Sequence, residues 1–160
     1  MPAAAHAHAP ADLGRVFVDT GAFVALLSAR DDHHTEADGS FRQAAERHVP
    51  LVTTNLVVAE AHRLILFRAG IAAAKAALQA IDSSKALTLH FAMAADHAAA
   101  RRWLAKLSDQ VITYTDAVSF AVMERLRCRA ALSFDHDFVV AGFRLWEHEH
   151  REFKAYTNVR

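Results

Sequence analysis

The stretch VFVDTGAFVALLS, residues 16–28, decides the fold class of this chain. Its first three residues are β-branched or aromatic and predict a short buried strand that ends at Asp19. Residues 20–28 are largely apolar and predict a buried helix directly after it. A short apolar strand that leads straight into a helix is typical of an α/β protein with a parallel sheet.

The same alternation continues along the chain. Further short apolar runs predict strands at residues 51–53, 86–91, 130–134 and 143–146. A polar stretch at residues 29–40 is expected to be a loop that passes into a helix, and helices are predicted at residues 41–47, 56–69, 71–81, 93–107 and 113–127. Because strands alternate with helices, we expect a three-layer α/β/α fold around a parallel sheet.

Length and composition narrow the class of protein. The 160 residues, 53% of them apolar, are enough for one domain with a sizeable core. Eighteen basic residues balance 18 acidic ones, which argues against a polybasic, non-specific nucleic-acid binder. The single cysteine, Cys128, excludes an internal disulfide and a thiolate zinc cage, and favours a reducing cytoplasm.

The two ends of the sequence differ from its middle. Residues 1–15 are rich in Ala, His and Pro and lack the basic and apolar regions of a signal peptide, so a flexible leader is expected. Residues 16–146 carry the α/β pattern and form the predicted domain, and residues 147–160 form a charged C-terminal tail. No apolar run approaches the ~18–20 residues of a membrane span, so we expect no membrane association.

Three aspartates stand where strands and helices meet. Asp19 ends the first strand, Asp116 opens a helix, and Asp135 follows the strand at residues 130–134, with Asp137 two residues later. Each one alone is also explained as a helix cap, a favourable charge in a first helical turn, or a turn residue. Ligands of open parallel sheets bind beyond the carboxyl ends of the strands, which is where these side chains are expected.

Glu60 is the fourth unusual acid. It shares the spacing of an apolar stripe with Val57, Ala61 and Leu64 and is therefore predicted to face the core. A buried carboxylate needs a partner, which is either a local ion pair with His62 or Arg63, or a metal ion.

If these acids converge, their charges repel one another and require a cation. Oxygen ligands without cysteine suit Mg²⁺ or Mn²⁺, and such a centre hydrolyses phosphodiester bonds. A phosphohydrolase of the haloacid dehalogenase type also begins with an aspartate at a strand end. That chemistry needs a second aspartate two residues later, where this chain has Gly21.

The order of these motifs resembles the PIN-domain nucleases and, more narrowly, the VapC-type toxins of bacterial toxin–antitoxin pairs. The segments that carry the resemblance are residues 16–20, 53–60, 114–123, 131–138 and 141–145. The resemblance implies a parallel five-stranded sheet of order 3-2-1-4-5 and an Mg²⁺-dependent endoribonuclease that cleaves tRNA or a ribosomal RNA loop. It also implies a homodimer and a VapB-type antitoxin as partner.

Positions in the resemblance assign roles to individual residues. Asp19, Glu60, Asp116 and Asp135 match the four catalytic, metal-binding acids, and Asp137 matches an accessory metal ligand. Thr20, Thr115 and Ser133 match hydroxyl residues that orient the carboxylates. The working hypothesis is a toxin endoribonuclease that uses Mg²⁺ or Mn²⁺, and the alternative is a non-catalytic RNA-binding or scaffold domain of the same fold. Scattered histidines, including His33 and His34, are expected to be solvated surface residues.

Overall fold

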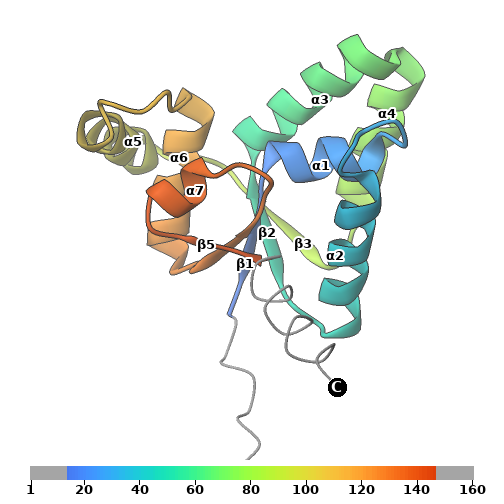
Figure 1. The fold of residues 1–160 in the computed structure, drawn as a ribbon, viewed down its shortest axis with the longest axis horizontal. Helices are drawn as coiled ribbons and strands as arrows, with labels where there is room; N and C mark the ends of the chain where they lie inside the picture. The colour runs from blue at the N-terminus through green and yellow to red at the C-terminus, as the bar shows by residue number, and fades with distance from the viewer. Residues whose placement is uncertain (1–13, 147–160) are drawn as a thin grey trace, which may run out of the picture.

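A computed structural model describes residues 14–146 and contains one five-stranded parallel sheet (Figure 1). Its strands are β1 (Val16–Val18), β2 (Leu51–Thr54), β3 (Leu87–His90), β4 (Ala130–Leu132) and β5 (Arg144–Leu145). They lie in the order β3-β2-β1-β4-β5, which confirms the predicted order. The predicted leader and C-terminal tail lie almost wholly outside the described residues.

The position of each strand in the sheet follows from how apolar the strand is. All three residues of β1 are fully buried, and β1 occupies the centre, where Phe17 pairs with Val52 on one side and Ala131 on the other. The residues of β3 are half-buried or exposed, and β3 lies at an edge. A strand that is apolar on both faces is stable only between layers of helices, so the composition of β1 accounts for its position.

Seven helices surround the sheet within the described part of the chain. They are α1 (Thr20–Leu27), α2 (His34–Glu46), α3 (Asn55–Ala69), α4 (Ile71–Ser83), α5 (Ala94–Lys106), α6 (Tyr114–Leu126) and α7 (Asp137–Val140). The polar stretch at residues 29–40 is, as predicted, a loop that passes into a helix, and α2 begins at His34. None of these helices is both long and apolar enough to cross a membrane.

Helix α7 is absent from the predicted elements, which placed only a turn at residues 135–137. The turn is present, because the Asp137 amide donates a hydrogen bond to Oδ1 of Asp135 at 2.9 Å. It leads into a single helical turn whose Phe138 is fully buried against Phe17 and Phe120. Packing of one aromatic ring therefore extends a local turn into a helix, which no periodic pattern of four residues could predict.

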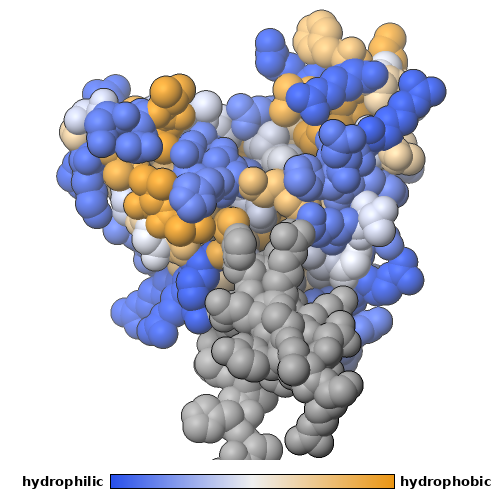
Figure 2. All heavy atoms as spheres, viewed as in Figure 1, coloured by the Kyte–Doolittle hydropathy of each residue, from blue (hydrophilic) through white to orange (hydrophobic). Residues whose placement is uncertain are grey.

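The helices form two groups. Helices α1 to α4 pack against one another, whereas α5 packs mainly on α6, and Figure 1 shows the groups on opposite sides of the sheet. Figure 2 shows that the surface dips between them, above the point where β1 leads into α1. The carboxyl ends of the central strands therefore meet at one edge, between the two groups of helices.

Candidate metal centre

Asp19 and Asp135 leave neighbouring strands at the same edge of the sheet. Val18 of β1 pairs with Leu132 of β4, and the Asp19 amide donates to the Leu132 carbonyl at 3.1 Å. From β1 the chain fills one half of the sheet with β2 and β3, and then crosses to β4 and β5. These two acids therefore flank the point where the strand order reverses, the usual ligand position in an open α/β sheet.

Ser133 links the two acids through its hydroxyl group. The hydroxyl donates to Oδ2 of Asp19 at 3.0 Å and accepts the amide N–H of Asp135, also at 3.0 Å. The next bond along the chain joins the Asp137 amide to Asp135. One serine thus fixes the Asp19 carboxylate, directly after β1, and the backbone that carries the acids after β4.

Asp116 is held at the start of α6 by Thr113. The Thr113 hydroxyl and amide both donate to Oδ2 of Asp116, at 2.5 and 3.1 Å, and the Asp116 amide donates back to the threonine hydroxyl at 3.1 Å. This reciprocal arrangement is a helix capping box. Within residues 14–146 the other carboxylate oxygen receives no hydrogen bond, so it is free to contact a ligand.

Glu60 reaches the same edge from the second turn of α3. It is half-buried, and its Oε2 accepts a hydrogen bond from the Thr20 hydroxyl at 2.7 Å. The alternative of a local ion pair is wrong for the described part of the chain, because no basic group lies within 4.0 Å of this carboxylate. The Arg63 guanidinium instead lies over the Phe67 ring, 5.6 Å from its centroid.

The acids come together as a cluster. Asp116, Asp135 and Asp137 each offer a carboxylate oxygen, and these atoms lie within 4.8 Å of one another. Burial raises the pKa of Asp116, and the charges of Asp135 and Glu60 raise it further. Asp19 is also close enough to Asp116 for their charges to interact. The structure thus places all five predicted acids at one edge of the sheet.

The cluster carries more negative charge than the protein neutralises. Asp19 is only 5% exposed, and its burial, followed by the charge of Asp116, raises its pKa to about 7 despite the bond from Ser133. Burial and the charge of Asp135 also raise the pKa of Asp137. In the described part of the chain no Lys, Arg or His forms an ion pair with any of the five acids. A hard divalent cation with oxygen ligands fits this donor set.

Thr115 does not have the orienting role that was predicted for it. The Thr115 hydroxyl makes no hydrogen bond to a carboxylate within residues 14–146, although its carbonyl accepts from Ser119. Thr113, which is not among the predicted residues, holds Asp116 instead. The sequence signal was present, since a threonine three residues before an acid at a helix start is the pattern of a capping box.

These acids, on this sheet, define the class of protein. The chain belongs to the PIN-domain family, whose model matches residues 16–144. It is 35% identical over 128 residues to the 23S rRNA-specific endonuclease VapC20 of two Mycobacterium tuberculosis strains, CDC 1551 / Oshkosh and ATCC 25618 / H37Rv. The match covers 80% of this chain and 95% of those relatives.

A solved structure supports the same family. The crystal structure of M. tuberculosis VapC20, described as a toxin that cleaves the sarcin–ricin loop, aligns with a TM-score of 0.72 and 34% identity. The alignment covers 80% of this chain and 95% of that one. The predicted resemblance to VapC-type PIN domains is therefore confirmed.

Proposed function

We propose that this protein is a metal-dependent endoribonuclease that acts as the toxin of a toxin–antitoxin pair. The observation that carries the proposal is the cluster of Asp116, Asp135 and Asp137, which forms no ion pair in the described residues and lies where the strand order reverses. The 35% identity to a 23S rRNA-specific endonuclease supports RNA as the substrate.

The donor set defines which residues would hold the metal. Asp116, Asp135 and Asp137 would bind one or two Mg²⁺ or Mn²⁺ ions, with Asp19 and Glu60 completing the site. Such an ion, when bound, lowers the pKa of a water molecule and polarises the scissile phosphate.

The hydroxyl groups of the chain keep the acids in place before a metal or substrate arrives. Ser133, Thr113 and Thr20 each donate to one oxygen of an acid, namely Asp19, Asp116 and Glu60, respectively. In the described part of the chain the second oxygen of Asp116 accepts no hydrogen bond and remains available. Fixed ligands need little rearrangement on binding, and residues that orient ligands in this way commonly contribute 10–100-fold to metal affinity or activity, as an order of magnitude.

The proposal also covers the RNA substrate and the protein partners. Since the relatives are named for 23S rRNA and the sarcin–ricin loop, we favour a ribosomal RNA loop over tRNA as the substrate. A VapB-type antitoxin, a homodimer and a cytoplasmic location follow from the resemblance to VapC-type toxins and belong to the same proposal.

The decisive experiment is cleavage of intact ribosomes and of total tRNA by the purified protein, with Mg²⁺, Mn²⁺ or EDTA. An Asp116→Asn variant purified in parallel controls for contaminating nucleases. Discrete fragments that require metal and disappear with the variant are expected. Metal-independent RNA binding without cleavage by either protein would favour the non-catalytic scaffold instead.

A further inference from the structure

The loop between α1 and α2 touches the segment that carries two of the metal-binding acids. The His33 ring stacks on the Phe134 ring, with the centroids 4.3 Å apart and the planes inclined by 14°. Phe134 lies between Ser133, whose hydroxyl donates to the Asp19 carboxylate, and Asp135, whose amide donates to the Ser133 hydroxyl. We propose that His33 is a positioning residue that holds the Ser133–Asp137 segment through this stack, an inference that rests on the proposed metal site.

The His33 ring is presented by a braced loop. The Asp31 carboxylate accepts the His33 amide at 3.0 Å, while the Asp31 amide donates to the Ser28 carbonyl at 2.9 Å. The neighbouring His34 amide donates to the Asp31 carbonyl, and its ring nitrogen Nδ1 lies 2.8 Å from the Ala25 carbonyl oxygen of α1. These contacts anchor the loop to α1 without any contribution from Phe134, so the His33 ring is a fixed support for it.

The Phe134 ring is enclosed on two sides. It packs against the hydrophobic core and is covered by His33. Its backbone lies between the Ser133 hydroxyl, which accepts the Asp135 amide, and the turn in which Asp135 accepts the Asp137 amide. A shift of the Phe134 ring therefore moves the backbone that aims both acids. The interaction free energy of an aromatic stack is large enough to change the population of the shifted state by about two- to tenfold.

Two other roles for His33 are separable from this one. Its side chain is 53% exposed, so its imidazole could contact RNA directly, and its Nδ1 lies 3.5 Å from the Glu36 carboxylate, so the pair could simply stabilise the start of α2. A His33→Phe variant keeps a ring on Phe134 and removes the imidazole. A Glu36→Gln variant removes the charge pair and keeps the stack.

The test compares wild type with His33→Ala, His33→Phe and Glu36→Gln by two measurements. Hydrogen exchange of the Asp135 and Asp137 amides is followed by NMR in metal-free protein, and Mn²⁺ affinity is measured by calorimetry without RNA. His33→Ala is expected to speed exchange at these two amides and to weaken Mn²⁺ binding, each by about two- to tenfold. His33→Phe and Glu36→Gln are expected to stay within twofold of wild type.

Several results would overturn the positioning role. They are unchanged exchange at both amides in His33→Ala, an equal effect in Glu36→Gln, no rescue by His33→Phe, or faster exchange spread evenly over the whole protein. Wild type that binds no Mn²⁺, or an Asp116→Asn variant that binds it equally well, would instead overturn the proposed metal site. The exchange measurement needs no metal and decides the role of His33 by itself.

Discussion

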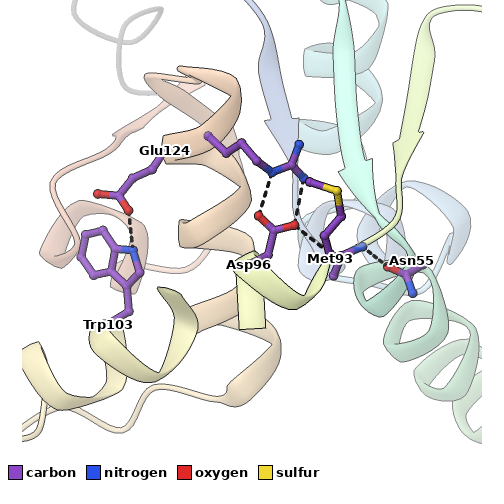
Figure 3. Close-up of polar contacts among 7 residues, drawn as sticks. Asn55, Met93, Asp96, Trp103 and Glu124 are labelled. Carbon is purple, nitrogen blue, oxygen red and sulfur yellow. Dashed lines mark hydrogen bonds and ion pairs between the residues drawn. The ribbon is translucent and has the colours of Figure 1, made fainter. Parts of the chain in front are cut away.

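Two buried aspartates of this protein have opposite surroundings. Asp96, near the start of α5, is 2% exposed and accepts two hydrogen bonds from Arg125, at 2.7 and 2.9 Å, and one from the Met93 amide at 2.8 Å (Figure 3). Burial alone would raise its pKa, but the bonds from Arg125 and Met93 outweigh burial, and the pKa is lowered. This carboxylate is a structural link between α5 and α6.

Asp19 is buried almost as deeply, at 5% exposure, and has no cation beside it in the described structure. It accepts hydrogen bonds from the Ser133 hydroxyl and from the backbone amides of Thr20 and Gly21, but burial and the charge of Asp116 outweigh these bonds and raise its pKa to about 7. The comparison shows that burial of an acid does not mark a functional site. What distinguishes the proposed metal centre is burial without an ion-pair partner, an arrangement that an external cation would stabilise.

The largest expected effect is on RNA cleavage, when an acid without an ion-pair partner is substituted. Asp116→Asn should reduce RNA cleavage by at least about 100-fold, more than the loss of a residue that only orients ligands. Its folding stability should not fall, because asparagine can still accept the Thr113 bonds without the cost of a buried charge. Cleavage assays and chemical denaturation of the same preparation test both statements. Full activity in this variant would remove Asp116 from the site.

The reverse pattern is expected at the paired acid. Asp96→Asn leaves the Arg125 guanidinium without its carboxylate partner and should lower the free energy of unfolding by about 3 kcal/mol. Cleavage per folded molecule should be unchanged. Urea denaturation measures the loss, and Asp82→Asn, at an exposed position of α4, is the matched control. Loss of cleavage in folded Asp96→Asn would show that the pair also supports the metal centre.

A pH-dependent effect is expected at Asp19. Its raised pKa means that the metal-free folded protein binds more protons than the unfolded chain between pH ~4 and 7, so its stability falls as the pH rises through this window. Asp19→Asn should therefore match wild type near pH 4 and be more stable above pH 7, by up to about 4 kcal/mol. Denaturation curves across this range in EDTA test it. A difference that does not vary with pH would contradict the unpaired state of this carboxylate.

The smallest expected effect concerns the hydroxyl that orients Asp116. Thr113→Val removes one donor to the carboxylate and should weaken Mn²⁺ binding about tenfold, with a helix-capping loss of about 1 kcal/mol. Thr113→Ser keeps the hydroxyl and should stay close to wild type. Calorimetry with Mn²⁺ and thermal unfolding separate the two losses. Equal Mn²⁺ affinity in the valine variant would mean that the capping box supports only the helix.

Local patterns predicted the positions of the acids but not their partners. Asp19 and Asp135 were identifiable because each follows a strand, and Asp116 because it opens a helix, where the capping box at Thr113 was readable from its spacing. The Asp96–Arg125 pair was not predictable, since 29 residues separate its members and only the packing of α5 on α6 joins them. The bond from Ser133 to Asp19 spans 114 residues for the same reason.

The sequence by itself determined the parallel α/β class, because short apolar runs that alternate with helices are stable only as a covered parallel sheet. It also determined which acids end the strands. Only the tertiary structure decided that these acids lie beside one another without an ion-pair partner in the described residues. It also decided that Asp96 forms an ion pair with Arg125 and that the His33 ring stacks on Phe134. Whether a carboxylate is ionised depends on the charges and burial around it in space, and side chains far apart along the chain supply both.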